Sequence, residues 1–469
     1  MRYALLLLLV PPLAVASCAP PGDAREATVV QVLVKADEVV LRTRPQLVRG
    51  KFARMAQSPF DFYRGSVPLF RADWESGRTS QSGFLAGAPP VLGIGDPHPE
   101  NFGLLLDREG TLALEPNDFD SADRVPYLFD VRRLATGLAL GARMQQPDAN
   151  PEAIARATAE AYATTFLALA DGAQPERITD DRGSAVLKDL FKRAHRDLLA
   201  RAELDQLTVV TEGQRRFLRG APDPTDPTAT LEDLDPAVAA TVPEALVRLG
   251  PSPHVLDVVR QFGSGVASWP RVRVLVLLDG PTPALEDDVL VELKELSESS
   301  LAGWYGPDPV ASDTPTRVEG ALRRSWAVPD ADPRWFTTTW WGLPLQVRTK
   351  SEANKGVNVD RWAGARGAGD ELTKLGAVLG ALLARVHSRS EPSVVAAVAA
   401  QVRRDPQAFA QEQGAVAAAE SLQVLADAER FRAALDRLGP LLGVTVDPRE
   451  LPGPLAAGVF GGAFDGGVP

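Results

Sequence analysis

Two short acidic segments, GDPHPENFG at 95–103 and NDFD at 117–120, interrupt apolar runs in the first third of the chain. The run PPVLGI (89–94) leads into the first segment, and TLALEP (111–116) leads into the second. Both runs have the length and composition of buried strand ends. The acidic segments are therefore predicted to lie at strand–loop junctions, where their carboxylate and amide oxygens offer the ligands that Mg²⁺ prefers.

The rest of the pattern predicts an α+β fold. Apolar residues recur at helical spacing from 127 to about 250, although the acidic, Pro-rich stretch 221–236 is typical of a loop. From 255 to 349 the pattern changes to candidate strands and short loops. The clearest later elements are a hairpin over 271–280 and 288–296, a strand over 340–349, and helices over 370–388 and 391–438.

Composition and pattern divide the chain into six segments. A chain of 469 residues exceeds one ordinary core, so more than one domain or lobe is expected. The predicted segments are a lipoprotein signal peptide (1–17), a tether (18–30), an N-terminal region with the acidic segments and a helical lobe (31–250), a strand-rich lobe (251–362), C-terminal helices (363–450) and a flexible tail (451–469).

The first residues have the pattern of an export signal. Arg2 precedes an apolar run over 4–10 that is too short to span a membrane as a helix. The sequence VASC at 15–18 resembles the lipobox of bacterial lipoproteins, in which the cysteine carries the lipid. Cys18 is the single cysteine, so disulfides within the chain are excluded. A plain secretory signal with an incidental cysteine is the alternative.

The lipobox resemblance implies a soluble body that is anchored to a bacterial membrane by a lipid, such as palmitate, on Cys18. Ala19 stands where an inner-membrane retention signal has Asp. In a Gram-negative cell the expected location is therefore the periplasmic face of the outer membrane. No other stretch of the sequence is long and apolar enough to span a bilayer.

The charge of the chain bears on its partners. The formal net charge is −11, whereas a general nucleic-acid binder presents a basic face. No nucleic-acid partner is therefore expected. An acidic balance still allows a local basic pocket for a phosphorylated ligand.

The acidic segments resemble motifs of one enzyme fold. GDPHPEN at 95–101 resembles the GDxHxxN catalytic loop of the aminoglycoside phosphotransferase and choline kinase branch of the protein-kinase-like fold. DFD at 118–120 resembles the D-[FW]-[DE] motif that follows there, and the intervening chain has room for the two strands of that fold's catalytic hairpin. Asp130, in YLFDVRRLA, resembles a later Asp that is structural in the family.

This resemblance implies a role for each matching position. Asp96 would be the catalytic base, and His98 would support the loop around it. Asn101 and Asp118 would bind the metal ion, with Asp120 beside them. The implied cofactor is Mg²⁺ or Mn²⁺, and ATP is the implied co-substrate.

A wider set of segments resembles the bacterial family of unknown function 2252, which is grouped with the kinase-like fold. The resemblance covers most of residues 50–390. The segments are SPFDFYRG, GDPHPENFG, NDFDSAD with YLFDVRRLA, VELKE and LARVHSR.

The nucleotide-binding elements of such a fold are expected before the catalytic loop, but their counterparts here follow it. The turn Gly263-Ser264-Gly265 precedes the predicted hairpin, and Lys294 in VELKE is placed like the phosphate-binding lysine of a VAIK-type strand. The helix over 379–389, which resembles the one that leads into the catalytic loop, lies later still. The order predicts a bilobal kinase-like fold that is circularly permuted.

The remaining candidates are a partner for the lysine and two structural residues. A phosphate-binding lysine is fixed by a glutamate in kinases. Glu319, in the predicted helix RVEGALRRSW, is the favoured partner of Lys294, and Glu298 is the nearer alternative. Arg64 is interpreted as a structural partner of a carboxylate, and His387 is expected to pack under the catalytic loop.

Two functions stay open from the sequence. One is an ATP- and metal-dependent phosphotransferase with an unidentified acceptor. The other is an inactive nucleotide-binding or scaffold protein of the same fold, which an export signal favours because ATP is scarce outside the cytoplasm. The D-x-H of Asp96 and His98 also occurs in binuclear metallohydrolases, but a chain with four His lacks the ligands that such sites need.

Overall fold

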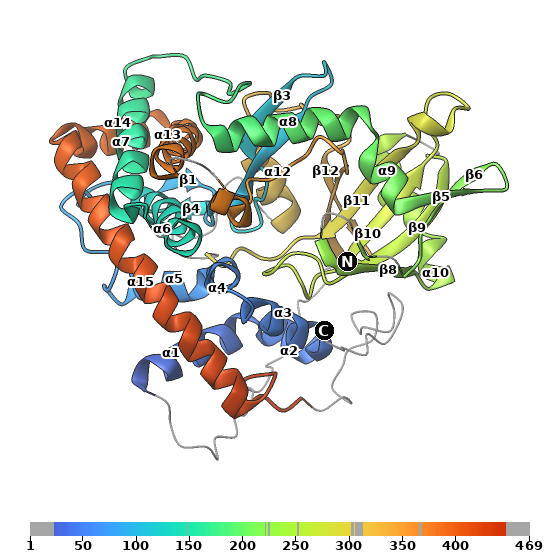
Figure 1. The fold of residues 1–469 in the computed structure, drawn as a ribbon, viewed down its shortest axis with the longest axis horizontal. Helices are drawn as coiled ribbons and strands as arrows, with labels where there is room; N and C mark the ends of the chain where they lie inside the picture. The colour runs from blue at the N-terminus through green and yellow to red at the C-terminus, as the bar shows by residue number, and fades with distance from the viewer. Residues whose placement is uncertain are drawn as a thin grey trace, which may run out of the picture.

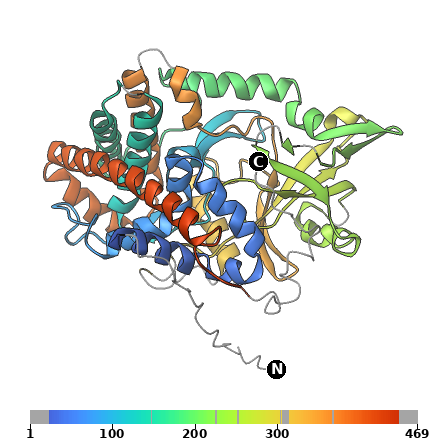
Figure 2. The ribbon, with the colours of Figure 1, turned by 60° about the horizontal axis from the view of Figure 1, so that its bottom comes forward.

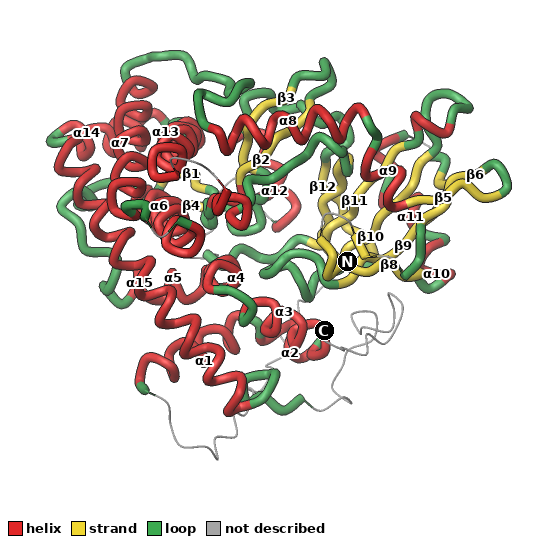
Figure 3. Tube along the Cα trace, in the orientation of Figure 1, coloured by secondary structure: helices red, strands yellow, loops and turns green. Residues whose placement is uncertain are grey.

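The computed structural model describes residues 23–146, 148–220, 222–223, 226–250, 253–301, 304, 313–364 and 368–446. The predicted signal peptide, Cys18 and the predicted tail lie outside these residues. A helical lobe lies on the left of Figure 1 and a strand-rich lobe on the right, and Figure 3 shows the same division by secondary structure. The fold is therefore mixed α+β.

Long helices build the left-hand lobe, and they pack closely. Helix α6 is buried on nearly all sides, including its charged residues Asp130, Arg132 and Arg133. Helix α13 approaches α7 so closely that a Cβ atom on Gly380 would lie 2.2 Å from the carbonyl oxygen of Thr158. The helices are α6 (Tyr127–Gln145), α7 (Pro151–Ala170), α13 (Ala368–His387), α14 (Pro392–Arg403) and α15 (Pro406–Leu438).

The helix predicted over 391–438 is two helices. Pro406 occupies the first turn of α15, and the Asp405 side chain accepts a hydrogen bond from the Ala408 amide. A proline and a capping residue at this point start a new helix.

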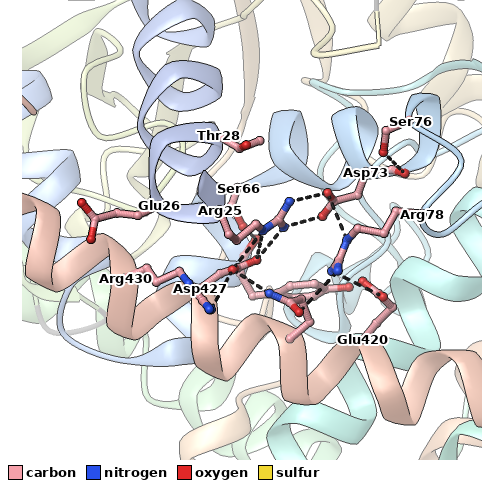
Figure 4. Close-up of polar contacts among 12 residues, drawn as sticks. Arg25, Glu26, Thr28, Ser66, Asp73, Ser76, Arg78, Glu420, Asp427 and Arg430 are labelled. Carbon is pink, nitrogen blue, oxygen red and sulfur yellow. Dashed lines mark hydrogen bonds and ion pairs between the residues drawn. The ribbon is translucent and has the colours of Figure 1, made fainter. Parts of the chain in front are cut away.

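A set of shorter helices at the N-terminus packs along α15, which Figure 2 shows in red beside them. The predicted tether ends earlier than expected, because Asp23 caps a helix that begins at Ala24. Arg25 holds this helix in place through Asp73 and Asp427, on two other helices (Figure 4). The helices are α1 (Ala24–Ala36), α2 (Glu38–Thr43), α3 (Pro45–Met55), α4 (Pro59–Gly65) and α5 (Val67–Glu75).

An antiparallel sheet of seven strands forms the right-hand lobe, in the order β12-β13-β11-β10-β9-β8-β7. The predicted hairpin corresponds to β10 and β11, in which Val276 pairs with Val291. The strands are β7 (Pro222–Asp223), β8 (Asp226–Asp233), β9 (Val255–Phe262), β10 (Arg273–Leu278), β11 (Val289–Glu295), β12 (Phe336–Trp340) and β13 (Leu343–Thr349).

The sheet begins before the predicted boundary at 251, and part of the predicted loop 221–236 is strand. Thr230 of β8 pairs with Phe262 of β9. Ala229 and Leu231 are fully buried and alternate with polar residues, which is the period of a strand with one face in the core. The flanking Pro and Asp residues hid this short alternation.

Between the lobes lie the small sheets that carry the acidic segments. Strand β2 (Phe102–Leu106) pairs with β3 (Leu112–Pro116), and β1 (Val91–Gly93) pairs with β4 (Asp123–Val125). The chain after β13 runs along β2, where the Leu104 amide donates to the Lys355 carbonyl at 2.8 Å. These contacts join the end of the strand-rich lobe to the hairpin.

The remaining elements lie in the region that was predicted to be mainly helical and in the segments beside the strands of the large sheet. They are the helices α8 (Ala185–Leu199), α9 (Ala202–Leu207), α10 (Pro236–Ala239), α11 (Val242–Ala245) and α12 (Thr314–Ser325), the hairpin strands β5 (Thr208–Thr211) and β6 (Gln214–Phe217), and the 3₁₀ helices Pro99–Asn101, Val247–Leu249, Leu285–Asp287 and Val359–Gly364. Among the described residues, none of the helices has the length and hydropathy needed to cross a membrane.

Candidate functional site

A cavity of about 1060 Å³ lies between the lobes. Its walls come from the N-terminal helices, the β2–β3 hairpin, strands β11 and β13, and the turn between β9 and β10. Most of the predicted site residues line it, although they come from distant parts of the chain: Asp96, His98, Asn101, Asp118, Asp120, Ser264, Gly265 and Lys294.

Helix α6 holds the loop that carries Asp96 through hydrogen bonds. The Asp130 carboxylate accepts hydrogen bonds from the amides of Ile94 at 2.7 Å and Gly95 at 3.1 Å. His387 Nε2 lies 3.2 Å from the same carboxylate. Asp130 and His387 therefore have the structural positions that the sequence predicted.

Asp96 is held by a residue that the sequence analysis missed. Arg133 Nε lies 2.8 Å from Asp96 Oδ1, and the buried guanidinium stacks 3.6 Å from the centre of the Tyr63 ring. Burial raises the pKa of Asp96 to about 6, against the opposing effect of the Arg133 charge. The carboxylate is thus fixed in orientation and is a better proton acceptor than an exposed aspartate.

Beside Asp96, the His98 side chain is buried and Asn101 is half-buried. Asn101 Nδ2 donates to the Asp96 carbonyl at 2.7 Å, and the Asn117 amide donates to the Asn101 carbonyl at 3.0 Å. Burial lowers the pKa of His98 well below its usual value, so the ring is neutral. The Nδ1 atom of His98 has no hydrogen-bond partner among the described residues.

The second acidic segment contacts Lys294, which lies on β11 of the strand-rich lobe. The Lys294 ammonium lies 3.3 Å from Asp118 and 2.9 Å from Asp120. Burial and the neighbouring Asp118 charge raise the pKa of Asp120. Burial opposes ionisation of Asp118 as well, but the positive charge of the nearby Lys294 acts against burial, and the pKa of Asp118 is lowered overall. One ammonium thus offsets two carboxylates that repel each other.

The wall beside Lys294 carries further charges that were not predicted. Glu292 forms ion pairs with Arg273 and, at 2.6 Å, with Arg348. Burial opposes ionisation of Glu292, yet the two guanidinium groups lower its pKa. Glu292 and Lys294 are two residues apart on β11, and Arg271 lies two residues before Arg273 at the start of β10, so period-two spacing of charges was a detectable signal.

The glycine turn lies where the sequence predicted it, between β9 and β10. Gly263 and Gly265 both have positive φ, at 72° and 78°, which other residues adopt rarely. Ser264 and Gly265 line the cavity, whereas Gly263 is not among its described lining residues.

The predicted partner of Lys294 is not confirmed. Glu319 instead binds Arg248, Arg323 and the backbone and hydroxyl of Thr337, and it does not line the cavity. The inward-facing polar residue of α12 is Arg317, two positions earlier. The register of this helix, which packing sets, turns Glu319 away. Glu298 lines the cavity but has no described bond to Lys294.

The residues present suit a hard metal ion. Among the described residues there is no group of three or more His, Cys, Asp or Glu at metal-binding distance. Asp118, Asp120 and Asn101 nevertheless line one cavity, and Asp120 Oδ1 is buried with no hydrogen-bond partner among the described residues. A buried, unpaired carboxylate oxygen is suited to a cation.

Comparison with known proteins bears out the family resemblance. A family model described as an uncharacterized protein conserved in bacteria (DUF2252) matches residues 42–434. No curated protein and no solved structure matches the chain. Since the family match covers well over half of the sequence, the chain belongs to the DUF2252 family.

Proposed function

We propose that the protein is a metal-dependent phosphotransferase that uses ATP, on a circularly permuted kinase-like fold. The observation that carries this proposal is the approach of Lys294, on β11 of the strand-rich lobe, to Asp118 and Asp120, at 3.3 and 2.9 Å. Phosphoryl transfer needs a base, oxygen ligands for metal ions and a cation for the phosphates. Residues of each kind line the one cavity.

The order of elements in the strand-rich lobe supports the kinase-like assignment. A glycine turn, a strand with Lys294 and then helix α12 follow one another along the chain. The Gly-rich loop, the lysine strand and the αC helix have this order in protein kinases. Because the β2–β3 hairpin precedes all of them, the proposed relation is a permutation.

The proposal gives each residue a task. Asp118, Asp120 and Asn101 would hold Mg²⁺ or Mn²⁺, which offsets phosphate charge when bound. Lys294 binds the phosphates, and the turn at Ser264 and Gly265 covers them. Asp96, oriented by Arg133, accepts the proton of the acceptor hydroxyl.

A second candidate is an inactive nucleotide-binding or scaffold protein. It is favoured by the partners of Lys294 and Glu319. In active protein kinases the lysine pairs with a glutamate of αC. Here Lys294 pairs with the acidic segment and Glu319 pairs with Arg248.

ATP hydrolysis, with water as a slow acceptor, separates the two candidates. The full chain with MgATP is expected to release phosphate, and Asp96→Asn is expected to bind MgATP but release at least 100-fold less phosphate. Wild-type protein that binds MgATP without any release supports the inactive candidate. Equal release by Asp96→Asn contradicts the role of Asp96.

The lipid anchor on Cys18 and the location at the periplasmic face of the outer membrane belong to the same proposal. They rest on the VASC sequence at 15–18.

A further inference from the structure

Helix α12 contacts the second acidic segment through an apolar cluster. The Phe119 ring lies between Asp118 and Asp120 in sequence and is 3% exposed. It packs in a cluster with Val318 and Leu322 of α12. The backbone that carries both carboxylates is therefore seated on this helix.

A second contact is polar and independent of the first. The half-buried guanidinium of Arg317 donates only to carbonyl oxygens in its described hydrogen bonds, and burial lowers its pKa. Four carbonyl oxygens accept hydrogen bonds from the Arg317 guanidinium. They belong to Ala122 at 2.5 Å, Asp120 at 3.0 Å, Ser297 at 3.1 Å and Phe119 at 3.5 Å.

These bonds join three parts of the site. Ser297 follows the strand that ends at Glu295, whereas Phe119 and Asp120 belong to the second acidic segment and Ala122 directly follows it. Hydrogen bonds from a charged donor are stronger than those between neutral groups. One side chain of α12 thus fixes the acidic segment relative to the strand of Lys294.

We propose that Arg317 is a positioning residue that holds Asp118 and Asp120 in the arrangement that a metal ion requires, so that its carbonyl bonds raise metal affinity. The inference rests on the proposed function for its metal site. Lys294 supplies one positive charge to the two carboxylates, so their mutual repulsion is only partly offset when no metal ion is bound. Without the four bonds to carbonyl oxygens, the acidic segment is free to move so that the carboxylates of Asp118 and Asp120 separate. Bringing the two carboxylates together again then reduces the free energy of metal binding.

The test uses the full chain with three variants. Arg317→Met removes the charged head and keeps the apolar stem, Arg317→Lys keeps the charge with fewer donors, and Arg323→Met is the matched control. Arg323 lies on the same helix, is 36% exposed on its side chain and pairs with Glu319 and Asp330. Its loss removes a similar side chain without touching the acidic segment.

Calorimetric titration with Mg²⁺ or Mn²⁺ alone gives the first measurement. Arg317→Met is expected to weaken the metal at least tenfold, Arg317→Lys less than that, and Arg323→Met by less than twofold. Metal affinity in Arg317→Met equal to that of the wild type overturns the inference.

Hydrogen exchange of the ligand-free chain gives a second measurement that does not depend on metal. The Asp120 amide donates to Asp118 Oδ1, and the Ala122 amide donates to the Phe119 carbonyl. Both amides are expected to exchange at least tenfold faster in Arg317→Met than in Arg323→Met. Unchanged exchange overturns the inference, whatever the metal does. Faster exchange in a chain whose wild type binds no metal supports the positioning role and contradicts the proposed function.

Discussion

The Lys294 ammonium, in the strand-rich lobe, lies 2.9 Å from the carboxylate of Asp120, which belongs to the second acidic segment between the lobes. The strand-rich lobe and the acidic segments therefore share one cavity. The contact between Lys294 and Asp120 makes the site sensitive to residues that hold the strand or the acidic segments in place.

Arg133 is predicted to stabilise the fold through Asp96. Arg133→Met leaves a buried carboxylate without its partner, which is expected to cost about 3–5 kcal/mol of unfolding free energy. Arg143→Met on the same helix removes hydrogen bonds to Ser421 and Ala418, which are neutral, and is expected to cost about 1 kcal/mol. Urea denaturation measures both. Equal losses in the two variants contradict a special role for Arg133.

Gly95 is predicted to be required for the close packing of the two acidic segments. It has φ of 79°, and a Cβ atom there would lie 2.0 Å from the Ser121 carbonyl oxygen. Gly110 has φ of 80° with nothing within 4 Å, so Gly110→Ala reports the backbone strain alone, about 1–2 kcal/mol. Gly95→Ala is expected to lose at least twice as much unfolding free energy. A loss no greater than that of Gly110→Ala shows that the segments move apart easily.

The ion-pair cluster of Figure 4 predicts a pH dependence of stability. Burial raises the pKa of Glu420 from 4.5 to about 7, with Arg78 and Arg25 opposing the shift and Asp73 and Asp427 adding to it. Between these two values the folded chain binds more protons at this site than the unfolded chain. Stability at this site therefore falls as pH rises from about 4.5 to about 7, by roughly 3 kcal/mol at most.

Glu420→Gln removes this dependence. The variant is expected to gain stability relative to the wild type at pH 8 and to lose that gain at pH 5, as measured by urea denaturation at both values. Glu429→Gln, at an exposed position of the same helix, serves as the control. A difference between Glu420→Gln and wild type that is the same at both pH values contradicts the prediction.

Cys18 is predicted to anchor the protein to a membrane. Cys18→Ala is expected to move the protein from the membrane fraction to the soluble fraction and to abolish labelling with palmitate. Ser17→Ala changes a neighbouring residue and retains the cysteine, so it is expected to remain membrane-bound. Membrane association and labelling of Cys18→Ala at the wild-type level would mean that another feature anchors the chain.

Local patterns predicted the parts of the site that lie within one element. Asp96 and Asp118 follow short apolar runs, where the structure has strands β1 and β3, and Asn101 directly precedes β2. The alternation around Lys294 and in its partner strand predicted the central hairpin, because a strand buried in a sheet carries its signal in a few adjacent residues.

Features that depend on packing between distant segments could not be predicted in this way. Arg133 lies on an apolar helix, and its pairing with Asp96 depends on the fold that stacks it on Tyr63. Which of Arg317 and Glu319 faces the site depends on the rotation of α12 about its axis. Both residues lie in the same helix with the same local sequence context, so the sequence does not distinguish them. Helical spacing places residues on a common face, but the face that meets the site is set by tertiary contacts.

The most direct test of the central claim is the stabilisation of the full chain by MgATP. A ligand that binds only the folded chain is expected to add about 2.7 kcal/mol at a hundredfold excess over its dissociation constant. Thermal melting of wild type, Asp118→Ala, Lys294→Ala and the surface control Lys192→Ala is compared with ATP, with and without Mg²⁺. Wild type and Lys192→Ala are expected to show a Mg²⁺-dependent shift, Asp118→Ala to lose its metal-dependent part, and Lys294→Ala to need a much higher ATP concentration. No metal-dependent nucleotide shift in the wild type at millimolar MgATP would contradict the account.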